Sequence, residues 1–171
     1  METGIVIAVL ATCLAASVSD VRTRRIPNLL TIGVALAGLV FHLVFGGFAG
    51  IGNACLGWAV GAALFFPLFA LGGMGGGDVK MLAAIGAWVG PAAAAWTALY
   101  AAIAGGVLAI LVGLFHGYLK TAFVNIWQML LTWWFAGVRP VPSLTLDDAR
   151  GPRLAYALPI SVGAMVTLWL R

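Results

Sequence analysis

Two aspartates, Asp20 and Asp78, are the side chains in this sequence most able to do chemistry. Each lies at the end of a long apolar run, where a carboxylate is costly and is therefore a candidate for function. Two carboxyl groups that lie a few Å apart cannot both ionise, so they share a proton. The ionised member can then activate water while the protonated member polarises a carbonyl group. If the fold brings these two aspartates together, they have the chemistry of an aspartyl protease.

The stretch from Gly72 to Lys80 contains five of the 23 glycines. Glycine weakens helices and allows close approach of another backbone. Non-helical backbone at membrane depth survives only where protein or a water-filled cavity satisfies its polar groups. We therefore expect a water-accessible break between two membrane helices, in which Gly75, Gly76 and Gly77 admit an extended substrate backbone beside the aspartate that follows them.

Composition assigns the chain to the integral membrane proteins. It is 63% hydrophobic and 8% charged, with a mean hydropathy of +1.10, whereas soluble domains are about 25% charged. We expect one integral-membrane domain over residues 1–171. The first helix should be uncleaved, because no positive region precedes it. The net charge of +4 does not indicate nucleic-acid binding, because the basic residues are scattered among membrane segments, where they act as topology signals.

Apolar runs of about 20 residues predict an all-α, polytopic protein with six membrane spans. The expected spans are residues 4–19, 29–45, 51–71, 79–94, 96–115 and 154–170. Pro27 stops the first loop and can start the next helix. The glycines of residues 46–50 predict a turn between the second and third spans.

Residues 117–138 predict an amphipathic helix at the membrane interface. Its polar stripe has helical spacing and comprises Thr121, Asn125, Gln128 and Thr132. Trp127, Trp133 and Trp134 are typical interface anchors. The alternative is a seventh span whose polar stripe faces the bundle.

The basic residues favour the arrangement with six spans. It places eight of the nine on one face, namely Arg22, Arg24, Arg25, Lys80, Lys120, Arg139, Arg150 and Arg153, with Arg171 opposite. The positive-inside rule makes the face with eight cytoplasmic and puts the N-terminus outside. A seventh span would move Arg139, Arg150 and Arg153 outside, which disfavours it. Both aspartates then lie on the cytoplasmic face of the membrane.

Structural roles compete with the chemical ones at these positions. Asp78 would cap a helix starting at Val79, and Asp20 would pair with Arg22 or Arg24 at a helix end.

The remaining polar residues also have simple interpretations. Lys80 would hold the neighbouring aspartate or a backbone carbonyl, or would only mark the cytoplasmic side. Asp147 and Asp148 lie in a polar loop beside two arginines, so we interpret them as solvated.

Metal binding is not expected. His42 and His116 lie near opposite ends of different spans, where we interpret them as interfacial, and Cys13 and Cys55 are isolated within apolar segments. No pair has the spacing of metal ligands, so the sequence predicts no metal and no cofactor.

Two motifs resemble the type IV prepilin peptidases, which are GxGD membrane aspartyl proteases. The first is Asp20 followed by Ile26-Pro27-Asn28, and the second is Gly75-Gly76-Gly77-Asp78 with Lys80 after it. A weaker match is Ala155-Tyr156-Ala157-Leu158-Pro159-Ile160, where the family usually has proline before the tyrosine. The chain is most similar to the short forms that serve tight-adherence or Flp-type pili.

This resemblance implies a function, catalytic residues and a partner. Asp20 and Asp78 would be catalytic, while the glycines, Lys80 and the Ile-Pro-Asn segment would shape the site. The partner would be a prepilin, a membrane helix whose short basic leader is removed at the cytoplasmic face. Longer members also methylate the new N-terminus with an additional region that often holds paired cysteines, which this sequence lacks. The resemblance therefore predicts a peptidase domain without a separate methyltransferase region and without N-methyltransferase activity.

Two other classes of function remain open at this point. The glycine break could be the pore loop of a small transporter or channel with Asp78 as an ion ligand. The chain could also be a non-catalytic component of pilus assembly that retains the motifs. The sequence leaves the particular pilin and the oligomeric state undetermined.

Overall fold

The computed structural model describes residues 2–141 and 154–170, which form helices and connecting segments without a strand. The helices are α1 (Glu2–Thr23), α2 (Asn28–Ala70), α3 (Gly76–Val89), α4 (Pro91–Phe115), α5 (Leu119–Ala136) and α6 (Ala157–Trp169). Three of them, α1, α2 and α4, are long and apolar enough to cross a membrane, and α6 is a shorter apolar helix. The expectation of an all-α membrane protein is confirmed.

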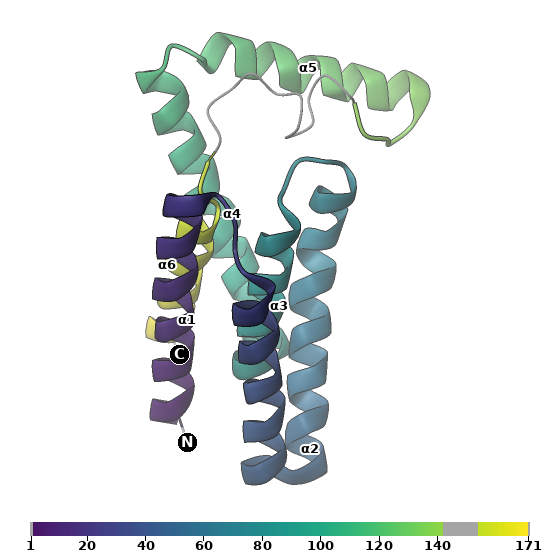
Figure 1. Cartoon of the computed structure of the whole chain (residues 1–171). Coiled ribbons are helices and arrows are strands. Elements are labelled where there is room, and N and C mark those ends of the chain that lie inside the picture. The colour runs from purple at the N-terminus through teal and green to yellow at the C-terminus, as the bar shows by residue number, and fades with distance from the viewer. Residues whose placement is uncertain (1, 142–153, 171) are drawn as a thin grey trace.

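The long helix α2 folds back on itself and so provides two of the predicted spans. Gly47 interrupts it with φ 59° and ψ −151°, a left-handed backbone conformation that other residues adopt only under strain. We call residues 28–46 the first arm and residues 48–70 the second arm. Figure 1 shows the arms running side by side in opposite directions, in agreement with the two spans predicted at residues 29–45 and 51–71.

The predicted boundary between the fourth and fifth spans is wrong. The break falls at Gly90, several residues before the predicted boundary at 94–96. Gly90 has a φ of 81°, and Pro91 occupies the first turn of α4. A proline disfavours helix in the residue before it and is well suited to begin one, so α3 ends at Val89.

Helix α5 lies across one end of the bundle instead of running along it (Figure 1). It is not among the helices long and apolar enough to cross a membrane in the described part of the chain. Its aromatic side chains are largely exposed, with Trp127 64% and Trp134 84% accessible. This placement agrees with the interfacial helix predicted from residues 117–138.

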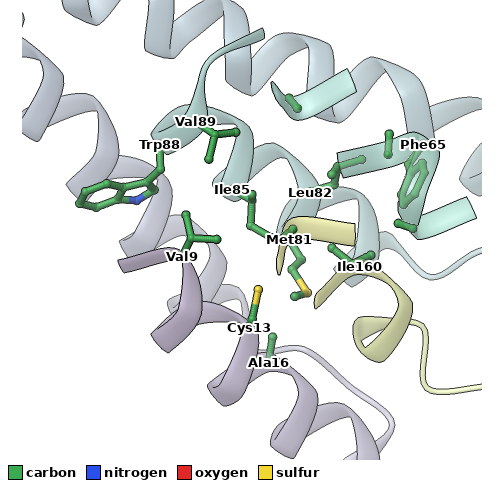
Figure 2. Close-up of a cluster of buried hydrophobic side chains, with 14 of the residues drawn as sticks. Val9, Cys13, Ala16, Phe65, Met81, Leu82, Ile85, Trp88, Val89 and Ile160 are labelled. Atoms are coloured by element: carbon green, nitrogen blue, oxygen red, sulfur yellow. The ribbon is translucent and has the colours of Figure 1, made fainter. Parts of the chain in front are cut away.

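Helix α3 lies at the centre of the molecule. From Asp78 to Val89 every residue except Lys80 is buried, as expected for a helix that is packed on all sides. In the cluster of Figure 2, Met81 and Ile85 of α3 lie among buried side chains from α1, α2 and α6. The first turn of α3, which carries one of the two aspartates, is therefore held on a rigid element.

Glycines allow the second arm of α2 to touch α3 backbone to backbone. A Cβ atom on Gly57 would collide with the carbonyl oxygen of Gly86, and one on Gly86 would collide with that of Gly57. A Cβ atom on Gly61 would lie 2.6 Å from the carbonyl oxygen of Leu82. Small residues that permit such close approach are the usual means of packing membrane helices. These contacts fix the position of α3 along the bundle.

Candidate active site

One cavity of about 380 Å³ contains both aspartates, and we call it the cleft. It lies where α1 ends and α3 begins, at the end of the bundle across which α5 runs (Figure 1). Its lining residues are Asp20, Arg24, Arg25, Ile26, Pro27, Asn28, Gly75, Gly76, Gly77 and Asp78. The fold thus brings together every residue that the sequence assigns to the site except Lys80, although the two groups are separated by two passes along the bundle.

Asp20 lies in the last turn of α1 and is only 7% exposed. Its Oδ2 atom accepts a hydrogen bond of 3.1 Å from the backbone N–H of Ala157, the first residue of α6. The first N–H groups of a helix have no partner inside it, and its positive end favours a carboxylate. Asp20 therefore joins α1 to the start of α6 across the cleft.

Asp78 lies in the first turn of α3 and is 9% exposed. Its carboxylate is hydrogen-bonded by the backbone of Gly75, and its own N–H donates to the Gly75 carbonyl oxygen at 3.1 Å. This reciprocal pair resembles a capping box at a helix start. The sequence suggested that Asp78 could cap a helix starting at Val79, but the helix starts at Gly76 and its N-cap is Gly75. Asp78 instead pairs with this N-cap residue, which begins the GxGD motif.

The two carboxyl groups interact electrostatically with each other. Capping explains why each aspartate lies at a helix terminus, but it does not require that both line one small cavity. In a site that holds two neighbouring carboxyls, a single shared proton relieves the repulsion between them. The cleft therefore has the groups needed for coupled acid and base catalysis.

The glycines let the segment before Asp78 approach its surroundings closely. A Cβ atom on Gly77 would lie 3.2 Å from the Cβ atom of Ile26, and one on Gly75 would lie 3.1 Å from the Asp78 carboxylate. Gly76 packs in the same way against the ring of Phe69, at 3.2 Å. The glycine motif and the Ile-Pro-Asn segment thus form one contact surface.

The loop between α1 and α2 also lines the cleft. Ser19 and Thr23 donate hydrogen bonds of 2.8 and 3.1 Å to the carbonyl oxygen of Arg25, which fold the loop back on the helix. Arg24 has a φ of 53°, a strained conformation for a residue with a side chain. Pro27 then precedes the first residue of α2 with φ −61° and ψ 135°, which confirms that a helix begins after it.

Lys80 does not have the partner that the sequence suggested. Its Nζ atom donates a hydrogen bond of 2.9 Å to Oδ1 of Asn28, and not to Asp78 or to a backbone carbonyl. Lys80 does not reach Asp78 because the two side chains leave α3 in different directions. Lys80 is the exposed residue of this helix, whereas Asp78 lies on a buried side. The bond joins the first turns of α2 and α3 beside the cleft.

Sequence reasoning missed the contribution of α6. Besides the N–H group of Ala157, Tyr156 interacts electrostatically with Asp78 and packs edge-on against Phe65, with ring centroids 6.0 Å apart. A Cβ atom on Gly105 would lie 2.7 Å from the tyrosine oxygen, so a glycine is needed there. The weak match around Tyr156 was the only signal for these contacts.

A pair of serines holds α6 in place beside the aspartates. The Oγ atoms of Ser17 and Ser161 are 2.9 Å apart, and Ser161 also donates to the carbonyl oxygen of Ala157 at 2.8 Å. Ser17 lies one turn before Asp20 on α1. The serine pair therefore fixes the position of the start of α6 along α1, next to Asp20.

The other candidate residues lie elsewhere. His42 was expected at the interface, but it is buried and its Nε2 atom lies 3.0 Å from the carbonyl oxygen of Trp88. Asp147 and Asp148 lie outside the described residues. Within residues 2–141 and 154–170, no three His, Cys, Asp or Glu side chains are grouped as metal ligands would be.

Comparison with known proteins finds relatives of the stretch that contains both aspartates. The sequence model of the type IV leader peptidase family matches residues 7–110, a stretch that includes Asp20 and Asp78 and ends before α5. No solved structure matches the chain significantly.

Curated relatives match over a similar region. The chain is 36% identical over 105 residues to the prepilin leader peptidase/N-methyltransferase of Aeromonas hydrophila, which covers 57% of this chain and 33% of that protein. It is 37% identical over 107 residues to the protein of the same name from Burkholderia pseudomallei, covering 58% and 34%. A type 4 prepilin-like proteins leader peptide-processing enzyme of Escherichia coli is 32% identical over 120 residues, covering 64% and 45%. The matched stretch thus spans from a third to less than half of these relatives. Because the family model matches more than half of the chain and includes both aspartates of the cleft, the chain belongs to the type IV leader peptidase family.

Proposed function

We propose that the chain is a membrane-embedded aspartyl endopeptidase that removes the short basic leader from type IV prepilins of the Flp-like class. The observation that carries this proposal is that Asp20 and Asp78 line one cavity and interact with each other there. Membership of the type IV leader peptidase family and the names of the curated relatives support the choice of substrate.

The reaction follows from one proton shared by the two aspartates. The ionised carboxylate takes a proton from a water molecule, and the resulting hydroxide attacks the carbonyl carbon of the scissile peptide bond. The protonated carboxyl donates a hydrogen bond to the carbonyl oxygen and later gives its proton to the leaving amine. The two aspartates exchange roles during the cycle, so neither atoms nor protons are lost from the pair.

The walls of the cleft suit an extended substrate segment. Gly75, Gly76 and Gly77 present backbone without side chains, and the Ile-Pro-Asn segment lies against them. Because Arg24 and Arg25 also line the cleft, charge attraction cannot be what recognises a basic leader. Recognition instead depends on the apolar helix that follows the cleavage point.

We propose that the cleft faces the cytoplasm from the bacterial inner membrane. Within the described ranges, all six basic residues lie at the ends of elements that meet at the cleft's end of the bundle: Arg22, Arg24, Arg25, Lys80, Lys120 and Arg139. Basic residues are retained on the cytoplasmic side of membrane proteins. This orientation would meet a leader that has not crossed the membrane.

The proposal covers the peptidase activity only. The curated relatives are named for two activities, and the matched stretch covers only part of their length. That the chain does not methylate its product stays a prediction, which the mass of the new N-terminus would test. A product that carries a methyl group would contradict it.

The deciding experiment is a cleavage assay with the purified chain and a prepilin in detergent. The peptidase predicts a shortened pilin whose new N-terminus begins the apolar segment. A pilus-assembly component without activity would bind prepilin and leave it intact. A transporter or channel would leave it intact and would instead move ions across a vesicle membrane.

A further inference from the structure

A second, larger cavity lies between α2 and α3, and we call it the groove. It has a volume of about 520 Å³ and runs between the two arms of α2, with α3 behind them. It extends along the first arm from Thr31 to Leu39, a distance of about 12 Å at the rise of an α-helix. No residue of the groove belongs to the lining of the cleft.

The groove has a narrow floor of small residues and large apolar rims. Ala35 and Ala83 are buried in the floor, while Leu36 and Trp58 stand 56% and 47% exposed on opposite rims. Without a hydrophobic driving force in lipid, helices associate where small residues let their backbones come close. A floor of alanines between raised rims has that form.

The groove leads directly to the cleft. Val79 and Lys80 line the groove and immediately follow Asp78 in α3. Lys80 donates its hydrogen bond to Asn28, which lines the cleft one turn before Thr31 of the groove. A chain that leaves the groove beside Lys80 therefore meets Asn28, which lines the cleft that holds the two aspartates.

We propose that the groove binds the apolar membrane helix of the substrate and that this helix positions the cleavage point in the cleft. The inference rests on the proposed function and adds to it the surface that recognises the substrate. A lipid chain would also be apolar, but it would gain nothing from a groove that ends beside the catalytic pair. A substrate helix must lie on such a path, because its extended N-terminal segment has to enter the cleft next to Asp78.

The first test is photo-crosslinking in membranes. A photoreactive phenylalanine derivative replaces Leu36 or Trp58 in the groove, and Leu64 or Leu99 on exposed apolar faces outside it. The Asp78→Asn change prevents cleavage, and the chain is reconstituted with an Flp-type prepilin in vesicles of phosphatidylethanolamine and phosphatidylglycerol. Both groove positions should crosslink to the apolar part of the prepilin, and both control positions should not. Crosslinks to lipid alone, or equal crosslinking at all four positions, would overturn the inference.

The second test fills the groove without touching the cleft. Ala62 lines the groove and is half-buried, whereas the neighbouring Ala63 is exposed and lies outside it. Ala62→Phe should raise KM for the prepilin by about tenfold or more, the equivalent of about 1.4 kcal/mol of lost helix packing, and should change kcat little. Ala63→Phe should behave as the unaltered chain. A peptide with the leader and cleavage point but no apolar helix should be cut equally slowly by all three.

The two proposals fail in different ways. If the unaltered chain cuts the prepilin while Ala62→Phe keeps its KM and the groove positions do not crosslink, the groove is not the substrate surface although the peptidase stands. If the unaltered chain cuts nothing, the peptidase is contradicted. Crosslinking of prepilin at Leu36 and Trp58, which needs no cleavage, then still decides whether the groove binds it.

Discussion

At the scale of single residues, each aspartate of the cleft has a structural role at a helix terminus as well as its proposed catalytic role. Asp20 accepts the N–H group of Ala157 at the start of α6, and Asp78 exchanges hydrogen bonds with Gly75 at the start of α3. Helix termini orient both carboxyl groups, so little entropy is left to lose when they act. A residue that both completes a helix terminus and faces its partner across a cavity is well placed for catalysis on a rigid support.

The shared proton predicts how cleavage depends on pH. At low pH both carboxyls are protonated and no base remains, while at high pH both are ionised and no acid remains. The rate of prepilin cleavage should therefore be bell-shaped, and its two limbs should report apparent pKa values of the pair. A cleavage rate that keeps rising with pH, in a chain that stays folded, would show that catalysis depends on a single general base and not on a pair that shares a proton.

A second prediction at the residue scale concerns the group that activates the attacking water, which we propose to be a carboxylate and not a metal ion. The proposed water is activated by a carboxylate, and the cysteines and histidines lie apart from the cleft lining. Cleavage should survive prolonged treatment with a strong chelator. Loss of activity that zinc restores would contradict the aspartyl mechanism, whereas loss that no metal restores would point to damage by the chelator.

At the scale of elements, the position of Asp78 depends on how closely α3 approaches the second arm of α2. Backbone contact at Gly57, Gly61 and Gly86 leaves no room for a side chain. The serine pair between α1 and α6 plays the same part on the other side, because it holds Ala157 against Asp20. The cleft is thus defined by helix positions more than by its loops.

Two glycines of the same arm test this dependence. Gly61→Ala would place a Cβ atom 2.6 Å from the Leu82 carbonyl oxygen, whereas Gly52→Ala meets nothing within 4 Å. Gly61→Ala should lower the temperature of thermal inactivation and the cleavage rate. Gly52→Ala should keep the rate, and replacing an exposed helical glycine should stabilise the chain by up to about 1 kcal/mol. Equal behaviour of the two variants in a thermal-inactivation assay would mean that close helix approach does not hold the site.

At the scale of the whole molecule, the bundle is asymmetric in charge. The described basic side chains lie at the cleft's end, and the reversal of α2 at Gly47 lies at the other. This asymmetry determines which positions a membrane-impermeant reagent can reach from each side. The two ends of the bundle should be labelled from opposite sides of the membrane.

Cysteine labelling would test this orientation. In a chain with Cys13 and Cys55 replaced by alanine, cysteines at Thr23 and Gly73 should react only from the cytoplasmic side, and one at Phe48 only from outside. All three positions are exposed, whereas Met74 in the glycine break is buried and would react poorly from either side. If a cysteine introduced at Thr23 or at Gly73 is labelled from outside in intact cells, the topology is the reverse of the proposed one.

Local signals in the sequence were enough to predict the spans and most of the cleft. Hydropathy and glycine content predicted the arms of α2 and the break before Asp78, because both are properties of short segments. What could not be predicted depends on contacts between distant segments. The N–H group that bonds Asp20 comes from Ala157, and the partner of Lys80 is Asn28.

Two further predictions were wrong, the interfacial position of His42 and the boundary between the fourth and fifth spans. The first also depends on a contact between distant segments, whereas the second depends on a local signal. His42 looked interfacial because nothing in its own segment shows that α3 covers it and that Trp88 provides a carbonyl oxygen. The helix break at Gly90 could have been predicted from the local sequence, since a glycine before a proline is a strong signal for a helix boundary. The apolar continuity of the stretch around it led to the wrong position.

The central claim is that Asp20 and Asp78 act as one catalytic pair. Asparagine preserves size and some hydrogen bonding but can neither take nor give the catalytic proton. Groups that act as a unit are strongly non-additive, so losing both should cost little more than losing one. Asp147 and Asp148, which the sequence places in a polar loop, provide matched controls of the same chemistry.

The most direct measurement is the initial rate of prepilin cleavage by Asp20→Asn, Asp78→Asn, their double variant, Asp147→Asn and Asp148→Asn. Each protein is purified from membranes and checked for equal yield and thermal stability. We predict that both cleft variants lose cleavage to the detection limit, that the double variant is no worse, and that the two loop variants cut at nearly the unaltered rate. Substantial cleavage by Asp20→Asn or by Asp78→Asn would contradict it.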